Sequence, residues 1–365
     1  MKYQTIIIGS GIMGATTAYY LSKVQKNILL LDQYEIDNSL NSSYDHSRVF
    51  RYAYGTDEFY ANLAVKALTL WNDIEKESNT QLYFRCGCLF LENAYDTYAM
   101  KSYKTMKKLG LPIELLDGKN LKDRFPQFNC DSGVLDPNGG VLEANTAVTT
   151  VVALAQKNGV QVRTKTKVID IDEKIITVEN GEKINADTIV VTAGVWNTKL
   201  LKNKIPVIPS RQELLYFKPK RPNIFQKNVF PTFGHLESGF YGIPIHGISA
   251  VKIANHFPGK PADPDTVDRN VTKEFIDQCR EFLHTYIPEL ADGEVIKTKT
   301  CLYDMTPNED FILDEISENI VIGAGFSGHG FKFAPLIGMI LANLAIGKKN
   351  TFDLSRFTLD KPEII

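Results

Sequence analysis

The sequence predicts an α/β fold in which a domain built on a parallel sheet is interleaved with a second, mixed-sheet α+β domain. Three observations predict it. An apolar run near the N-terminus, Thr5–Ile8, enters a glycine-rich turn and then a helix. A second glycine-rich turn, at residues 323–330, follows another short apolar run, Ile320–Ile322. Between them lies a long stretch, 206–300, that is rich in aromatic residues, prolines and strand-like runs.

The composition limits the classes of protein to which this chain can belong. The 365 residues are enough for two domains with a large buried core. A hydrophobic content of 44% and a charged content of 23% are ordinary for a globular protein. The net charge of −2, from 41 basic and 43 acidic side chains, gives no reason to expect nucleic acid or an anionic membrane as a partner. No apolar run reaches the about 18 residues of a membrane span.

The cysteines indicate the compartment. They are Cys86, Cys88, Cys130, Cys279 and Cys301. An odd, scattered set in a long chain favours free thiols in a reducing compartment, which we expect to be the cytoplasm. The first strand is expected to begin at Tyr3, which leaves no room for a signal peptide. Cys86 and Cys88 are too close together for a zinc knuckle and are interpreted as small core residues, so no metal site is predicted.

The first glycine-rich turn has the spacing of a dinucleotide-binding motif. Gly9 permits a tight turn, Gly11 lets the backbone approach a pyrophosphate, and Gly14 lets helix and strand pack closely. The N-terminus of the helix supplies free N–H groups and partial positive charge to the phosphates. Asp32 ends a second apolar run, Ile28–Leu31, where a carboxylate can accept from ribose hydroxyls. The motif therefore predicts a Rossmann-type domain.

The other elements alternate between the two domains. Helices are predicted at Glu58–Lys76, Thr146–Lys157, Lys273–Tyr286 and from Pro335 to Gly347, and strands within Gln81–Glu92, Val160–Lys167, Lys174–Glu179 and Lys183–Thr192. We expect residues 1–80, 141–205 and 301–365 to form the cofactor domain. We expect residues 81–140 and 206–300 to form the substrate domain, with an antiparallel sheet and one helix in the second segment.

Two glycine-rich turns at opposite ends of the chain, with a substrate-type sheet between them, suggest a flavin enzyme. The first turn would hold the pyrophosphate, and the second, which contains Gly328 and Gly330, would bring backbone against the isoalloxazine ring. The polar loop Asn38–His46 carries hydroxyl and amide groups that could touch the cofactor, among them Ser43.

These features resemble a known family, the monomeric sarcosine oxidase group of FAD-dependent amine oxidases, which includes N-methyltryptophan oxidase and belongs to the D-amino acid oxidase superfamily. The resemblance covers essentially the whole chain. It rests on the segments Ile7–Gly14, Ser47–Gly55, Thr192–Trp196, Cys301–Pro307 and Gly323–Lys332, and on Lys252 with His256. The Cys301 and Gly323 segments are the most specific of these, and they occur in the family's order.

The resemblance implies FAD attached covalently through the sulfur of Cys301 to its 8α-methyl group. The alternative for this cysteine is a small buried hydrophobic residue. The predicted cofactor site also includes Gly9, Gly11, Gly14, Asp32, Ser43, Ser47, Val168, Gly328 and Gly330.

The resemblance also implies roles for four cations. Arg51 and Lys332 would bind the substrate carboxylate, because a planar guanidinium can make a bidentate contact and a second cation can lie beside it. Arg48 and Lys252 would face the flavin, where positive charge stabilises the reduced ring, and Lys252 would promote reaction with oxygen. The alternatives are an ordinary ion pair for Arg51 and a solvent-exposed strand-edge lysine for Lys252.

Two further side chains would lie beside the substrate. His256 could select the neutral amine, because an unperturbed imidazole titrates near about pH 6.5. Tyr241 could bound the pocket or donate its hydroxyl. A structural histidine and a core aromatic residue remain open alternatives. His329 is expected to support the geometry of its turn.

The predicted activity is flavin-dependent oxidation of a secondary (N-methyl) amino acid such as sarcosine, which gives a primary amino acid, an aldehyde and hydrogen peroxide. Another secondary amine acid (N-methyltryptophan, pipecolate or a fructosyl amino acid) and a flavin dehydrogenase with an acceptor other than oxygen remain open. A flavin-binding protein without turnover, or a component of a larger complex, is a different class, and the four cations together argue against it.

The sequence departs from the family near the expected pocket. Ser47 stands where many relatives have threonine, Tyr52 where histidine is common, and residues 245–248 are not a close match. These departures leave the substrate side chain open. We expect a cytoplasmic monomer that uses a small-molecule amino acid and oxygen, with no nucleic acid, membrane or metal partner.

Overall fold

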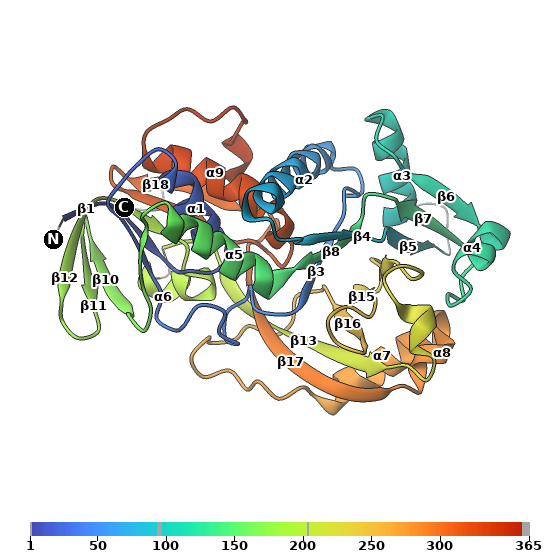
Figure 1. The fold of residues 1–365 in the computed structure, drawn as a ribbon. Helices are drawn as coiled ribbons and strands as arrows, with labels where there is room; N and C mark the ends of the chain where they lie inside the picture. Colours follow the sequence, from blue (N-terminus) through green and yellow to red (C-terminus); the bar gives the residue numbers. More distant parts are fainter. Residues whose placement is uncertain (1, 93–96, 203, 360–365) are drawn as a thin grey trace.

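The computed structural model describes residues 2–92, 97–202 and 204–359, and three sheets organise them (Figure 1). Strand β1 (Lys2–Ile8) and helix α9 (Ala334–Ala345) lie toward one end of the molecule, and helices α3 (Tyr98–Lys108) and α4 (Gly118–Arg124) lie at the other end (Figure 1). Within these ranges no helix combines the length and the apolar character that a membrane crossing requires.

The first sheet forms the predicted dinucleotide-binding core. Its strands are β1 (Lys2–Ile8), β2 (Ile28–Leu31), β9 (Gln161–Arg163), β10 (Val168–Asp172), β11 (Ile175–Val178), β12 (Lys183–Val191), β18 (Ile312–Ser317) and β19 (Ile320–Ala324). β9, β2, β1, β12 and β19 pair in parallel in that order. Parallel strands are covered on both faces, which explains why β1 and β2 are runs of buried isoleucine and leucine.

Helices α1 (Ile12–Ser22), α5 (Ala144–Lys157) and α9 (Ala334–Ala345) cover this sheet, and α1 packs against both of the others. The turn from β1 into α1 requires glycine. Gly9 has a φ of +98°, and a Cβ on Gly14 would clash with the carbonyl oxygen of Gly9. The helix can therefore approach the strand only because both positions lack a side chain.

The second sheet has the order β17-β13-β16-β15-β14-β5-β7-β6. Its strands are β5 (Cys88–Glu92), β6 (Glu114–Asp117), β7 (Ser132–Asp136), β13 (Ile208–Lys218), β14 (Thr232–His235), β15 (Phe240–Ile243), β16 (Val251–Asn255) and β17 (Glu294–Met305). Every pairing is antiparallel except that of β14 with β5. The whole sheet is therefore mixed, as the fold class predicts, while the strands of residues 206–300 pair antiparallel with one another, also as predicted. The expectation of one helix in that segment is wrong, because the short helix α8 (Pro288–Ala291) follows α7 (Lys273–Tyr286).

A small third sheet joins the two. It has the order β3-β8-β4 and contains β3 (Ser47–Phe50), β4 (Tyr83–Arg85) and β8 (Gly140–Glu143). The other helices are α2 (Glu58–Ser78), α3 (Tyr98–Lys108), α4 (Gly118–Arg124), α6 (Asn197–Leu200), α7 (Lys273–Tyr286) and α8 (Pro288–Ala291), with 3₁₀ turns η1 (Gly194–Trp196), η2 (Pro222–Phe225), η3 (Phe331–Phe333) and η4 (Ser355–Phe357).

The helices with clear caps match the sequence expectations well. α7 has the predicted bounds, and Thr272 caps it by accepting from the amide of Phe275 at 3.2 Å. α2 runs two residues past the predicted end and is capped by Asp57, which accepts from the amide of Tyr60 at 3.0 Å. The helix at Pro335 begins with that residue in its first turn, at Ala334.

Two strand expectations are wrong. Only Gln161–Arg163 of the predicted strand Val160–Lys167 is a strand, and the next strand, β10, was not expected. Its sequence, Val-Ile-Asp-Ile-Asp, has short alternation that a loop also tolerates, and hairpin pairing with β11 decides its conformation. The predicted division into two interleaved domains stays a prediction, and β17 runs across its boundary at residue 301.

Candidate functional site

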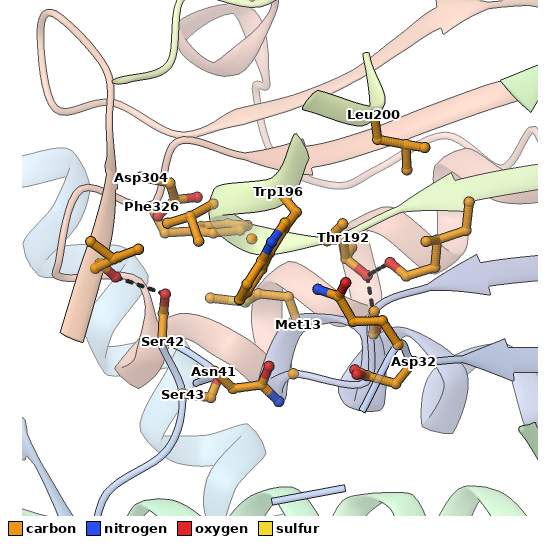
Figure 2. A pocket seen from close by; sticks show the side chains of 18 of the residues that line it. Met13, Asp32, Asn41, Ser42, Ser43, Thr192, Trp196, Leu200, Asp304 and Phe326 are labelled. Carbon is orange, nitrogen blue, oxygen red and sulfur yellow. Dashed lines mark hydrogen bonds between the residues drawn. The ribbon is translucent and has the colours of Figure 1, made fainter. Parts of the chain in front are cut away.

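A cavity of about 290 Å³ opens at the carboxyl ends of the first sheet's strands (Figure 2). Among the residues predicted for a cofactor, those that line it are Gly9, Gly11, Asp32, Ser43, Arg48, Val168, Gly328 and Gly330. Gly14 and Ser47 are not lining residues of this cavity or of its neighbour. The cavity lies where ligands of open α/β sheets bind, outside the carboxyl ends of the strands.

Hydrogen bonds fix the polar groups at the Asp32 end of the cavity. One carboxylate oxygen of Asp32 accepts from both the amide and the hydroxyl of Ser10 at 2.8 Å, and the other accepts from the amide of Tyr34 at 2.9 Å. The Ser43 hydroxyl accepts from the amide of Ile12 at 3.1 Å and so caps the start of α1. The predicted contacts of these side chains with ribose and phosphate stay predictions.

A second cavity of about 100 Å³ adjoins the first. Four residues line both cavities: Arg48, Tyr303, Gly328 and Phe331. The second cavity brings together all the residues predicted for the substrate side and the attachment cysteine, namely Arg51, Tyr241, Lys252, His256, Cys301 and Lys332. Much of the remaining wall is apolar and is formed by Val49, Cys88, Phe90, Leu214, Phe233, Leu236 and Ile243.

Comparison with known proteins identifies the family. A family model for FAD dependent oxidoreductases, named DAO, matches residues 4–344. The chain belongs to the DAO family of FAD-dependent oxidoreductases. It is 32% identical over 378 residues to the monomeric sarcosine oxidase of Arthrobacter sp. strain TE1826, with 99% of this chain and 97% of that protein covered.

Other comparisons agree. The chain is 31% identical over 374 residues to the N-methyl-L-tryptophan oxidase of Salmonella heidelberg strain SL476, with 99% of each covered. The solved structure of glycine oxidase from Geobacillus kaustophilus shares its fold, with a TM-score of 0.84 at 19% identity over 99% of each chain. The protein is therefore an FAD-dependent amine oxidoreductase, and the resemblance found in the sequence is confirmed.

The residues of the first cavity of this DAO-family oxidoreductase fit FAD. The Gly9 turn leaves no side chain between the strand and the N-terminus of α1, where a pyrophosphate can approach. A buried carboxylate oxygen, Oδ2 of Asp304, lines the same cavity and has no hydrogen-bond partner among the described residues. A polar ligand in the cavity would give it one.

Arg51, which is partly buried, and Lys332, which is buried, form a pair of cations in the second cavity. Lys332 donates to the Tyr54 hydroxyl at 2.9 Å and to the carbonyl of His329 at 2.7 Å. Arg51 donates to the Tyr98 hydroxyl at 2.7 Å and lies 4.3 Å from the centre of the Tyr54 ring. No acidic side chain of the described residues forms an ion pair with either cation, so the alternative of an ordinary ion pair for Arg51 is not observed.

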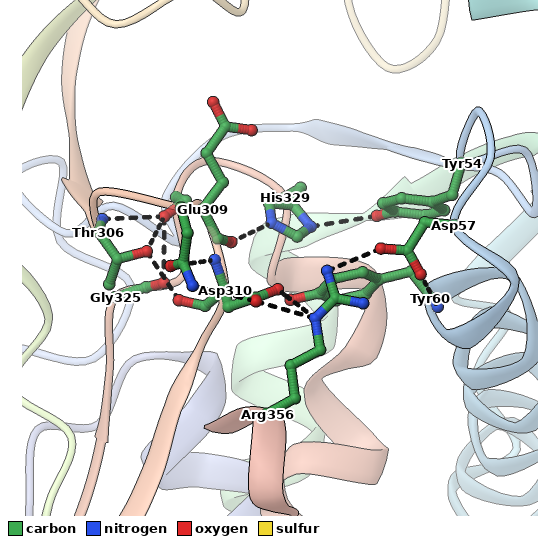
Figure 3. A network of polar contacts seen from close by, with 11 residues as sticks. Tyr54, Asp57, Tyr60, Thr306, Glu309, Asp310, Gly325, His329 and Arg356 are labelled. Atoms are coloured by element: carbon green, nitrogen blue, oxygen red, sulfur yellow. Dashed lines mark hydrogen bonds and ion pairs between the residues drawn. The ribbon is translucent and has the colours of Figure 1, made fainter. Parts of the chain in front are cut away.

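A hydrogen-bond chain runs from the Glu309 carbonyl through His329 to Tyr54 (Figure 3), and the Tyr54 hydroxyl in turn accepts from Lys332. His329 contacts the Glu309 carbonyl through Nε2 at 2.9 Å and the Tyr54 hydroxyl through Nδ1 at 3.2 Å. A carbonyl can only accept, so Nε2 carries the proton and Nδ1 accepts from Tyr54. The oxygen of Tyr54 is then free to accept from Lys332. Tyr54 and Tyr98 were not singled out in the sequence, where they look like ordinary core aromatic residues.

Arg48 and Lys252, the cations predicted to face the flavin, share one carboxylate, that of Asp45. Lys252, which is only 2% exposed, forms an ion pair with Asp45 and donates to the Ser47 carbonyl at 3.2 Å. Arg48 lies 3.4 Å from the same carboxylate, and the Tyr216 hydroxyl donates to it at 2.6 Å. Lys252 is therefore not a solvent-exposed strand-edge lysine. Asp45 was not predicted as a site residue, although three nearby cations, Arg48, Lys252 and Lys299, require an anion.

The pKa values in this cluster follow from burial and charge. Burial by itself would raise the pKa of Asp45, but Lys252 and Arg48 hold it well below its usual range. Burial lowers the pKa of Lys252, and Asp45 offsets part of that effect. Burial, with a contribution from Arg48, lowers the pKa of the neighbouring Lys299 to about 7. Asp45 is therefore the group that keeps Lys252 charged.

His256 is a neutral imidazole at pH 7. Burial lowers its pKa to about 4, and the charges of Arg51 and Lys332 add to the effect. Tyr241 lines the same cavity, and burial raises the pKa of its hydroxyl. Both residues are placed beside the cation pair as the sequence predicted, and their chemical roles stay predictions.

Binding of a small carboxylate to the second cavity should take up protons. Burial and the charge of Arg51 hold the pKa of Lys332 well below its usual range. A bound carboxylate would raise that pKa, so the protein should take up protons when the carboxylate binds. The affinity for acetate should therefore fall as pH rises through the pKa of free Lys332. Isothermal titration calorimetry in buffers of different ionisation enthalpy measures the uptake.

Two variants control this measurement. Lys332→Met should bind acetate more weakly and lose the proton uptake. Lys202→Met, which removes an exposed lysine paired with Asp170, should behave as the wild type does. Proton-neutral acetate binding by the wild-type protein at every pH tested would contradict the prediction.

Proposed function

We propose that this DAO-family oxidoreductase oxidises a small secondary amino acid, such as sarcosine, at a carbon bonded to the amine nitrogen. One observation carries the proposal: Arg51 and Lys332 line a cavity that adjoins the cofactor cavity, and no acidic side chain of the described residues pairs with either of them. A substrate carboxylate supplies the missing anion. The cavity of about 100 Å³ is well below the roughly 300–1,000 Å³ of drug-sized sites, which favours a small substrate.

The residues of the second cavity orient the substrate and select its neutral amine. Arg51 and Lys332 bind the carboxylate, and this contact fixes the amine relative to the wall that the two cavities share. The positive charge of the pair and the neutral imidazole of His256 disfavour an ammonium ion in the cavity. The lone pair on nitrogen is therefore available when the C–H bond is broken.

Bound FAD supplies the two-electron acceptor for this step. The substrate loses two electrons and two protons and becomes an imine, which water hydrolyses to an aldehyde and the primary amino acid. Arg48 and Lys252 place fixed positive charge at the junction of the cavities, where reduction of the cofactor develops negative charge. We propose oxygen as the final acceptor, with hydrogen peroxide as its product and Lys252 as the charge that stabilises the reduced oxygen species.

The names of the relatives support this class of reaction, since they are a sarcosine oxidase and an N-methyl-L-tryptophan oxidase. The bulkier substrates (N-methyltryptophan, pipecolate and fructosyl amino acids) and a dehydrogenase remain the alternative functions. A monomeric state is proposed on the name of the Arthrobacter relative. The cytoplasmic location stays a prediction from the free cysteines.

A panel of N-alkyl amino acids tests the substrate class. With peroxide as the readout, sarcosine should have a higher kcat/KM than N-methyltryptophan, because the cavity is small. Lys332→Met should lower kcat/KM for sarcosine about ten- to hundredfold, the size expected for a lost hydrogen bond between charged groups. Most of this loss should be in KM, and Lys202→Met should have wild-type kinetics.

Two outcomes would contradict this proposal in different ways. Reduction of a dye without peroxide, for every amine in the panel, would show a dehydrogenase. Equal rates with sarcosine and with an amine of similar size that lacks a carboxylate would show that the two cations do not bind the substrate.

We also propose that Cys301 carries the flavin, because it lines the second cavity beside Arg48 and Lys252 and is 8% exposed. Acid precipitation should leave the yellow colour with the protein pellet, and Cys301→Ser should release the colour to the supernatant. Cys88 also lines this cavity, so Cys88→Ser is a matched control that should keep the colour in the pellet. Colour that leaves the wild-type protein freely would disprove the attachment.

A further inference from the structure

Asp304 is a buried acid in the cofactor cavity for which the proposed reaction has no use. It is 5% exposed, and its Oδ2 has no hydrogen-bond partner among the residues that the structure describes. Along β17, Cys301 lines the second cavity, Tyr303 lines both, and Asp304 lines only the first. Figure 2 shows Asp304 beside Phe326, at the opposite side of the view from Asp32.

The surroundings place Asp304 at the flavin end of the cavity. Its neighbour Tyr303 lies where the two cavities join. The carbonyl of Asp304 accepts from the amide of Ser327 at 3.0 Å, which ties it to the second glycine-rich turn. Asp32, the acid expected to contact the ribose, belongs to the other end. An FAD molecule whose ribose lies near Asp32 therefore extends its isoalloxazine ring toward Asp304.

A buried carboxylate oxygen without a partner favours a ligand that can donate a hydrogen bond to it. Burying a polar group without a hydrogen bond is unfavourable, and native proteins rarely leave one unsatisfied. Burial raises the pKa of Asp304 to about 6, so at pH 7 the group is largely a carboxylate, which can only accept hydrogen bonds. On the isoalloxazine ring, the pyrimidine portion presents one N–H donor, N3–H, between two carbonyl groups.

We propose that Asp304 binds the pyrimidine edge of the flavin and that its carboxylate accepts the hydrogen bond of N3–H. The inference depends on FAD binding and is independent of the substrate. The negative charge of Asp304 opposes the positive charges of Arg48 and Lys252. Asp304 therefore lowers the reduction potential of the flavin, which those two cations raise.

A flavin analogue tests the contact directly. Apoprotein of the Cys301→Ser variant, which cannot attach the cofactor, is titrated with FAD and with FAD methylated at N3, which lacks the donor. With Asp304 present, FAD should bind about ten- to hundredfold more tightly than the methylated analogue, as expected for a hydrogen bond to a charged group. When Asp304→Leu is combined with Cys301→Ser, FAD should bind more weakly than to the Cys301→Ser protein. Most of the preference for FAD over its methylated analogue should then disappear.

Leucine is a suitable replacement because it is close to aspartate in size and removes a group that has an unsatisfied oxygen. Thermal melting of both apoproteins checks that the variant folds. A preference for FAD that is equally large with and without Asp304 would overturn the proposal. Equal weakening of both ligands by Asp304→Leu would do so too, since it would place the carboxylate on another part of the cofactor.

The midpoint potential gives a second readout, in the protein with Cys301 intact. Asp304→Asn keeps an acceptor for N3–H and removes the charge, so the potential should become more positive while the preference for FAD over its methylated analogue persists in the Cys301→Ser background. An unchanged potential would contradict the proposed electrostatic effect of Asp304.

Discussion

The buried carboxylate of Asp45 is the contact on which the cofactor side of the site depends. It is 1% exposed and pairs with Lys252, which itself is 2% exposed. Arg48 approaches it from β3 and Tyr216 contributes a hydroxyl from β13, so one carboxylate joins the small third sheet to the second sheet. A buried lysine without an anion would lose its proton or destabilise the fold. Asp45 allows positive charge to persist where the two cavities meet.

In the part of the chain that the structure describes, no acidic side chain pairs with the second group of cations. Arg51 and Lys332 bond to hydroxyl and carbonyl oxygens, with Tyr54 and His329 fixing the orientation of the lysine. The chain thus neutralises the cations beside the cofactor from within and leaves the cations in the apolar cavity for a ligand. Under the proposed function, this difference would let one small region both stabilise a reduced flavin and bind an acid-bearing substrate.

The sequence predicted the parts of this arrangement that depend on local patterns. The Gly9 turn could be recognised because the spacing of its glycines reflects a backbone geometry that only a few neighbouring residues determine. α7 could be placed because its apolar period and its Thr272 cap agree. The cation set came from motifs that match a family. Residue pairs such as Asp45 and Lys252, which are 207 positions apart, could not be found without the sheet topology.

The missed residues have the same explanation. Tyr54, Tyr216 and Asp304 are ordinary residue types whose importance comes from what lies opposite them in space. Strand β10 was missed because its five residues alternate too briefly to distinguish a strand from a loop, and the hairpin partner decides the outcome. Family resemblance predicted which groups touch ligands, while the groups that hold those side chains in place could be found only in the structure.

The most direct test of this account is the free energy of unfolding of Asp45→Asn, alone and combined with Lys252→Met. The single variant should lose about 3–5 kcal/mol, because it leaves a buried lysine without its partner. The double variant should recover most of that loss, since it removes the uncompensated charge as well. Chemical denaturation followed by tryptophan fluorescence provides both values, with Tyr216→Phe as a variant that loses only one hydrogen bond. A single variant as stable as the wild type, or a double variant no more stable than the single, would show that Asp45 does not hold the site's positive charge.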